Sequence, residues 1–87
     1  MTIIKKSGRK EEFDAEKLSR SIAAASDEAN EPLNESDLKI ILADFQLLVR
    51  DKQLITSQQI DIIIYGILYS KKYFGVLDRY ANYSNKR

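Results

Sequence analysis

The chain of 87 residues contains no cysteine and no histidine. Zinc fingers, thiol redox chemistry, histidine metal sites and catalysis by Ser-His or Cys-His pairs are therefore excluded. The two standard glycine-rich phosphate loops, Gly-x-x-x-x-Gly-Lys-Ser/Thr and Gly-x-Gly-x-x-Gly, are absent as well. Because most of the catalytic repertoire is missing, we do not expect an enzyme.

Long apolar runs and a large excess of one charge are also missing. The densest apolar segment, Ile60 to Tyr69, is too short to span a bilayer and contains Asp61, and no apolar run of signal-peptide type begins the chain. We therefore expect a cytoplasmic protein without a membrane partner. The net charge of +1 argues against a general nucleic-acid binder, which usually carries a large basic excess, but it leaves room for a small anionic ligand.

Positive charge is instead concentrated at the N-terminus, where the first ten residues hold no acid and the bases Lys5, Lys6, Arg9 and Lys10. A tight turn at Ser7-Gly8, where glycine takes a positive φ without strain, predicts a hairpin that pairs residues 2–6 with residues 9–13. Because side chains alternate along a strand, one of the two adjacent lysines should face the helices. A lysine-rich hairpin suits a polyphosphate, but the residues alone favour a solvated sheet edge whose charges resist edge-to-edge pairing.

Apolar residues at helical spacing predict helices over about residues 15–29 and 36–50, separated by a turn at Asn30-Glu31-Pro32. Asp14 is the expected N-cap of the first helix, and Asn34 or Ser36 that of the second. The apolar face of the second helix comprises Leu38, Ile41, Leu42, Phe45, Leu48 and Val49.

A third helix is expected to begin at Thr56-Ser57 and to be the most buried, with an inner stripe of Ile60, Ile63, Ile64, Ile67 and Leu68, widened by Ile62, Tyr65 and Tyr69. Lys71-Lys72 and Gly75 interrupt it, and a last helix over residues 75–87 has the apolar side Val76, Leu77, Tyr80 and Tyr83. Leu54-Ile55 can add a short strand beside the hairpin. We predict a single α+β domain over residues 1–87, a four-helix bundle capped by a small three-stranded sheet.

Several candidate site residues have a structural and a functional interpretation. Glu11, Glu12, Asp14 and Glu16 are best explained as a solvated acidic face, with Glu11 and Asp14 as candidates for hydrogen bonds to a ligand. The aromatic group of Tyr65, Tyr69, Tyr73, Phe74, Tyr80 and Tyr83 is best explained as core or interface, with Tyr83, near Lys86 and Arg87, as a possible base-stacking exception. Thr56 or Ser57 is most simply an N-cap, although a helix N-terminus can also receive an anion.

The segment from Ile3 to Leu18 reads Ile-Ile-Lys-Lys-Ser-Gly-Arg-Lys-Glu-Glu-Phe-Asp-Ala-Glu-Lys-Leu. Without a gap, it resembles the opening of the ATP-cone, Val-x-Lys-Arg-Asp-Gly-x-x-Glu-x-Phe-Asx-x-x-Lys-Ile. The ATP-cone is a nucleotide-sensing module of many ribonucleotide reductases and of the bacterial repressor of reductase genes. Weaker matches follow at Ser57-Gln58-Gln59-Ile60, similar to a Ser-x-x-Ile helix start, and at Arg79-Tyr80-Ala81, similar to Arg-Phe-Ala. The family's four-helix bundle under a three-stranded sheet agrees with the architecture predicted above.

The resemblance implies a regulatory module that binds ATP or dATP with Mg²⁺ and controls the self-association or activity of a ribonucleotide reductase. The resemblance therefore favours a nucleotide-binding role for the basic hairpin over a solvated sheet edge. The binding pattern it implies places Lys5 and Lys6 on the phosphates, Glu11 and Asp14 toward adenine and ribose, and Lys17 with Leu18 at the start of the first helix. Second-rank members of the pocket are Thr56, Ser57, Asp61, Tyr83 and Arg87.

The chain departs from the family pattern at three positions. Lys6 stands where arginine is frequent, Asp61 where some reductase cones have histidine, and Leu77 where the family has an aromatic residue. The repressor branch is disfavoured because it places a cysteine-bearing zinc ribbon before its cone. The alternative from another class is a helical adaptor whose tyrosine-rich last helix docks on a protein without any nucleotide. A nucleotide hydrolase is disfavoured because no base, arginine finger or metal cluster is recognisable.

Overall fold

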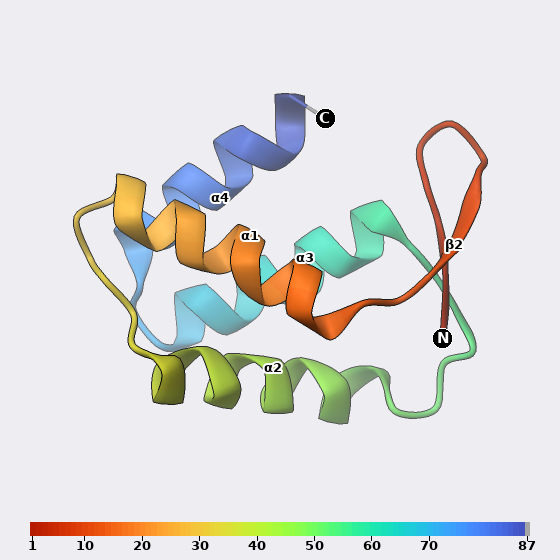
Figure 1. Cartoon of the computed structure of the whole chain (residues 1–87), viewed down its shortest axis with the longest axis horizontal. Helices are drawn as coiled ribbons and strands as arrows, with labels where there is room; N and C mark the ends of the chain where they lie inside the picture. The colour runs from red at the N-terminus through yellow and green to blue at the C-terminus, as the bar shows by residue number, and fades with distance from the viewer. Residues whose placement is uncertain (87) are drawn as a thin grey trace.

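Four helices and three strands make up the described part of the chain, residues 1–86 (for residues 85 and 86, the backbone), in a computed structural model (Figure 1). In chain order they are β1 (Thr2–Ile4), β2 (Lys10–Glu12), α1 (Ala15–Glu28), α2 (Glu35–Val49), β3 (Leu54–Thr56), α3 (Ser57–Ser70) and α4 (Phe74–Lys86). The predicted α+β class, with four helices and a small sheet, is confirmed.

The sheet has the strand order β2-β1-β3, with β1 antiparallel to β2 and parallel to β3. Ile3 at the centre of β1 lies opposite Glu11 of β2 and Ile55 of β3, so these side chains share one face of the sheet. Ile3 and Ile55 are buried in the core, so this face is the one turned toward the helices. The short strand predicted at Leu54-Ile55 is thus confirmed.

The hairpin differs by one residue from the predicted register. Thr2 lies opposite Glu12, whereas the expected pairing would place it opposite Phe13. The cause is a longer loop. The Gly8 N–H donates a hydrogen bond to the Lys5 carbonyl at 2.8 Å, and Gly8 itself has a φ of 88°. A turn closed by a left-handed residue adds one position to a hairpin loop, and glycine adopts that φ without strain. A one-residue shift exchanges the faces of a strand, so the middle residue of β2 faces the helices.

Polar side chains cap the N-termini of α1, α2 and α3, largely as expected. Asn34 caps α2 and Thr56 caps α3, each in a capping box with the residue three positions on. The Asn34 side-chain oxygen accepts a hydrogen bond from the Asp37 N–H at 2.8 Å, so Ser36, the second candidate, is not the cap. Asp14 caps α1, as predicted.

Two helices end in a left-handed residue. α1 ends at the predicted turn, where Asn30 has a φ of 55° and the Glu31 N–H donates to the Ser26 carbonyl at 3.1 Å. α3 ends in the same way at Lys72, with a φ of 65°. α4 begins at Phe74, one residue before its expected start at Gly75, so the break between α3 and α4 is slightly shorter than expected.

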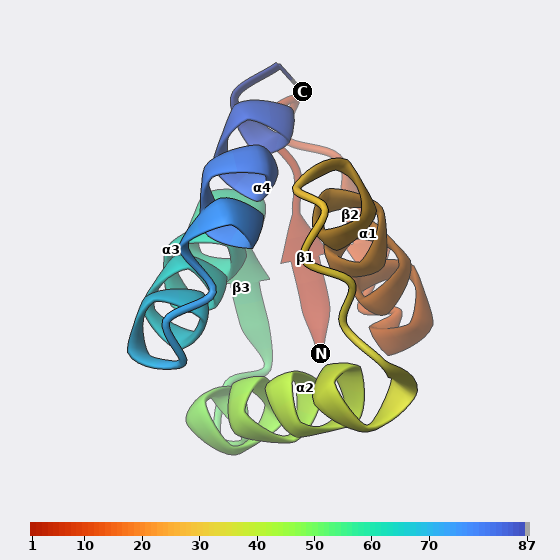
Figure 2. The ribbon, with the colours of Figure 1, turned by 90° about the vertical axis from the view of Figure 1, so that its left-hand side faces the viewer.

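The core is formed by one side of each helix and by the inner face of the sheet. Its buried apolar members are Ile3, Leu18, Ile22, Ala25, Ile41, Phe45, Val49, Ile55, Ile60, Ile64, Ile67, Leu68, Val76 and Tyr80. α3 buries Ile60, Asp61, Ile64, Ile67 and Leu68, more residues than any other helix in the described part, as its apolar stripe predicts. Figures 1 and 2 show α2 along one side of the molecule, α1, α3 and α4 on the other, and the hairpin at one end.

Four residues that were predicted to lie on apolar faces are exposed instead: Leu48, Ile62, Tyr69 and Tyr83, with 63%, 64%, 65% and 55% of their surface accessible. Each lies at the margin of its predicted stripe. A helix buries the arc that faces the bundle, and positions just beyond that arc turn outward even when they are apolar. The periodicity therefore locates the buried side correctly but overestimates its width.

Among residues 1–86, no helix combines the length and the apolar character needed to cross a bilayer.

Candidate functional site

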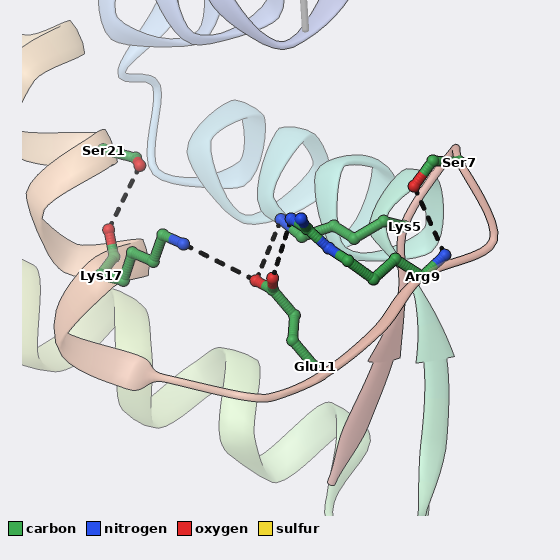
Figure 3. Close-up of polar contacts among 6 residues, drawn as sticks. All are labelled: Lys5, Ser7, Arg9, Glu11, Lys17 and Ser21. Carbon is green, nitrogen blue, oxygen red and sulfur yellow. Dashed lines mark hydrogen bonds and ion pairs between the residues drawn. The ribbon is translucent and has the colours of Figure 1, made fainter.

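The basic side chains of the hairpin meet the start of α1 around one carboxylate. Glu11 lies at the middle of β2, and its Oε1 is 3.3 Å from the Lys5 Nζ and 3.6 Å from the Lys17 Nζ. Its Oε2 is 3.4 Å from an Arg9 guanidinium nitrogen. Figure 3 shows the three bases converging on Glu11 from the two ends of the hairpin loop and from α1. Lys5 therefore faces the helices, as one of the two adjacent lysines was expected to do.

This arrangement changes the pKa of Glu11. Hydrogen bonding by Lys5, together with the positive charges of Lys5, Lys17 and Arg9, lowers the pKa of Glu11 below its ordinary value, against the opposing effect of partial desolvation. The carboxyl group is thus kept ionised, and the four side chains carry three positive charges and one negative charge.

A pocket opens beside this cluster, between the hairpin, the start of α1 and the first turns of α3. Its walls are Ile3, Lys5, Glu11, Glu12, Phe13, Asp14, Lys17, Leu18, Ser21, Ser57, Ile60, Asp61 and Tyr80. The pocket thereby brings together the predicted site residues Lys5, Glu11, Asp14, Lys17, Leu18, Ser57 and Asp61. Its lining combines buried apolar side chains, such as Ile3, Leu18 and Ile60, with several charged ones, and a mainly apolar lining with a few polar groups is usual for a small-molecule site.

Lys6 lies on the neighbouring hollow, which has a volume of about 310 Å³ and is lined by Lys5, Lys6, Ser7, Arg9, Ser57, Asp61 and Ser84. Lys5 and Lys6 therefore border one space, even though successive side chains along a strand point to opposite faces. The pocket beside Glu11 is smaller, at about 80 Å³. Small-molecule sites usually measure about 300–1,000 Å³, so a nucleotide-sized ligand would need both spaces or a shift of the side chains between them.

The N-terminal end of α3 also borders the basic hairpin. Thr56 lines a third hollow with Ile4, Lys5, Lys6, Ser57 and Gln58. Its hydroxyl oxygen is occupied in capping, since it accepts the Gln59 N–H at 3.1 Å. The positive end of a helix dipole next to two lysines makes this corner favourable for anions.

Asp61 is a buried acid at the base of both spaces, with 9% of its surface exposed. The hydroxyl of Tyr80, itself 1% exposed, donates a hydrogen bond to the Asp61 Oδ1 at 2.9 Å. This bond joins α3 to α4, and both of its residues line the pocket that Lys5 also lines.

Among the described side chains that were predicted for the site, Tyr83 is the one that lies apart from these three spaces. Tyr83 borders a shallow groove between α1 and α4, next to Lys17, Arg20 and Glu28. Arg87 lies outside the described residues. Asp14 does line the pocket, but its Oδ1 accepts hydrogen bonds from the backbone of Glu16 and Lys17, at 3.0 and 3.3 Å, and so holds the first turn of α1.

The sequence interpretation missed several residues that line these spaces, among them Arg9, Ser21, Tyr80 and Ser84. Arg9 was visible as part of the basic hairpin, and Ser21 follows Lys17 at one helical turn, so both had a detectable signal. Tyr80 and Ser84 come from α4; the resemblance implied that this helix contributes Tyr83 and Arg87, but it did not single out the face that carries Tyr80 and Ser84.

A family model described as the ATP cone domain matches residues 1–87, the whole chain. This chain belongs to the ATP-cone family. ATP-cone domains are regulatory modules that bind adenine nucleotides, and they are not catalytic domains. In this ATP-cone, the segment that resembles the family's opening forms the hairpin and the start of α1, which are two walls of the pocket. A comparison with curated protein sequences finds no match.

Proposed function

We propose that this ATP-cone domain binds ATP or dATP in the pocket between the hairpin, α1 and α3. One observation carries the proposal: residues that are far apart in sequence, from Lys5 to Asp61, line one pocket that combines charged and apolar side chains. Lys5 and Lys6 border a common hollow and would neutralise the phosphates. Leu18 would contact the base, and Ser57 would lie beside the phosphates.

The acidic residues would read the base and the sugar. Carboxylates accept hydrogen bonds from an exocyclic amine and from ribose hydroxyls, and Glu11 and Asp14 line the same pocket as Lys17. Asp61 would contribute a further acceptor at the base of the pocket. Thr56, Tyr83 and Arg87 are proposed as peripheral members of the site.

Mg²⁺ would arrive with the nucleotide. In the part of the chain that the structure describes, no group of three or more acidic side chains could hold a metal ion by itself. Mg²⁺ is usually bound through substrate phosphates together with one or two carboxylates and several waters. The role of the protein would therefore be to hold the phosphates that carry the ion.

The bound nucleotide would control the self-association or the activity of a ribonucleotide reductase in the cytoplasm. A ligand shifts an equilibrium only through different affinities for the two states, so ATP and dATP must favour different conformations or assemblies. The two nucleotides differ by the 2′-hydroxyl, which a polar contact must read. Size-exclusion chromatography with each nucleotide tests this step, because a switch requires at least one of them to change the elution volume.

Thermal unfolding with ATP, dATP and GTP, each with Mg²⁺, tests nucleotide binding itself. A ligand at 100 times its dissociation constant stabilises the folded state by about 2.7 kcal/mol. In a domain of this size, about 1 kcal/mol moves the unfolding midpoint by roughly 4–8 °C. We expect a clear rise with ATP or dATP and a smaller one with GTP. No rise with either adenine nucleotide would contradict the proposal.

One observation favours a protein-docking role as the second candidate. Tyr69 and Phe74 are exposed, and their rings pack edge to face at 5.5 Å where α3 is followed by α4. Exposed aromatic pairs of this kind are frequent at protein interfaces. A helical adaptor without nucleotide binding would be the remaining interpretation if the unfolding midpoint did not respond to adenine nucleotides.

A further inference from the structure

Glu11 occupies the point on which the bases of the pocket rim converge. Its two carboxylate oxygens are shared by Lys5, Arg9 and Lys17 at 3.3, 3.4 and 3.6 Å. The three bases belong to different segments, namely the two ends of the hairpin loop and α1 (Figure 3). Glu11 therefore holds together cations that would otherwise repel one another across the mouth of the pocket.

The contacts of Glu11 are loose and open to exchange. Hydrogen bonds between ions usually measure about 2.7–2.9 Å, and all three contacts here are longer. The side chains of Arg9 and Lys17 are 73% and 63% exposed, so water and salt weaken both pairs. A single carboxylate also leaves an excess of positive charge in the cluster.

A polyphosphate would satisfy the same bases better than a carboxylate does. Each phosphate group adds negative charge and acceptor oxygens, whereas Glu11 offers one charge and two oxygens for three donors. A ligand with several phosphates can therefore replace Glu11, while a monophosphate gains much less over the carboxylate it displaces.

We propose that Glu11 is an internal counter-anion that the phosphates of an incoming ligand must displace, and that it thereby sets the selectivity of this site for polyphosphates over monophosphates. The inference rests on the proposed nucleotide site and adds a specificity-determining role to one of its residues. Once displaced, the Glu11 carboxylate is released from Lys5 and Lys17 and becomes free to accept hydrogen bonds from the ribose or the base.

The variant Glu11→Gln tests this role, with inorganic tripolyphosphate as the probe. Tripolyphosphate has no base or sugar, so any direct contact between Glu11 and those groups does not affect the result. Calorimetric titration should show tripolyphosphate binding roughly three- to tenfold more tightly to Glu11→Gln than to the unmodified protein, because the competing anion is gone. The preference for ADP over AMP should decrease in the same variant.

Glu35→Gln is the matched control. Glu35 is exposed on α2 and forms an exposed ion pair with Lys39. Its replacement by glutamine changes the net charge of the protein by the same amount as Glu11→Gln does. It should leave the affinity for tripolyphosphate unchanged. If Glu11→Gln binds tripolyphosphate no more tightly than Glu35→Gln does, the counter-anion role is wrong.

Titration of ATP into the unmodified protein separates this inference from the proposed function. If ATP binds to the unmodified protein but Glu11→Gln shows no gain in tripolyphosphate affinity, the counter-anion role alone is overturned. No ATP binding to the unmodified protein or to Glu35→Gln overturns the proposed function as well. A second measurement needs no variant: the ¹³C shift of the Glu11 carboxyl should move on addition of tripolyphosphate, and an unchanged shift would contradict displacement.

Discussion

Single charged residues in this domain owe their roles to the face of the element on which they lie. Lys5 faces the helices because it follows Ile3 by two positions, and side chains on a strand alternate. Asp14 and Lys17 could be placed from the sequence, because the N-cap fixes where a helix begins. The contacts of Glu11 could not be placed, because its face depends on a hairpin register that one additional loop residue changes.

The replacement Lys5→Ala tests the phosphate role. The side chain forms one partly exposed ion pair, so its loss should change the free energy of unfolding of the unliganded domain by less than about 1 kcal/mol. Loss of a charged contact to the phosphates should weaken ATP binding by about tenfold or more, as measured by calorimetry. Lys39→Ala, which removes a lysine paired with Glu35 on α2, is the control and should bind ATP normally. Equal affinities of the two variants would refute the role of Lys5.

The lowered pKa of Glu11 predicts a pH dependence of stability. The hydrogen bond from Lys5 and the nearby positive charges lower the pKa in the folded state, so the unfolded state binds more protons between the two pKa values. The stabilisation by Glu11 is therefore present above its ordinary pKa and is lost as the pH falls through the lowered one. Urea unfolding from about pH 7 to about pH 2 should show the stability difference between the unmodified protein and Glu11→Gln shrinking. A difference that stays constant with pH would contradict this.

Whole elements were the most predictable part of the structure, because their signals are local. The three N-caps and the end of α1 at Asn30 follow from residue types with known preferences. The end of α3 at Lys72 was harder to place, since a lysine carries no preference for a left-handed backbone. The burial of helix margins depends on neighbouring elements, which explains why Ile62 and Tyr69 were assigned to the wrong side.

Thr56→Ala tests the cap that positions α3 beside the hairpin. The hydroxyl accepts the Gln59 N–H, and the Gln59 side chain accepts the Thr56 N–H in return. Loss of such a cap should lower the free energy of unfolding by about 0.5–2 kcal/mol in chemical denaturation. Ser36→Ala removes a hydroxyl from the first turn of α2, where Asn34 is the cap, and should change stability by less than about 0.5 kcal/mol. Equal losses in the two variants would argue against the capping role.

At the scale of the whole molecule, the candidate site is connected to the core. Tyr80 of α4 is almost fully buried, and its hydroxyl reaches Asp61 of α3 at the base of the pocket. The fold class followed from the order of the elements and from their periodicity. The face of α4 that reaches the pocket did not, because it depends on how helices that are distant in sequence pack against one another.

Tyr80→Phe tests this connection between core and site. The change keeps the ring and removes the donor to the Asp61 Oδ1, so it leaves a buried acceptor with one hydrogen bond fewer. The free energy of unfolding should fall by about 1–3 kcal/mol, measured by denaturant unfolding. Tyr69→Phe removes a hydroxyl from an exposed ring and should have little effect. A loss no larger than that of the control would show that the Tyr80 hydroxyl does not stabilise the fold.

The central claim is that an adenine nucleotide binds between the hairpin, α1 and α3. Its most direct test is the titration of ATP with Mg²⁺ into isotopically labelled protein, with the backbone amide shifts followed by NMR. We expect the largest shifts between Lys5 and Leu18 and between Thr56 and Asp61, and small shifts over the exposed side of α2, around Ile40 and Leu47. No shifts, or shifts centred on α2, would contradict the account.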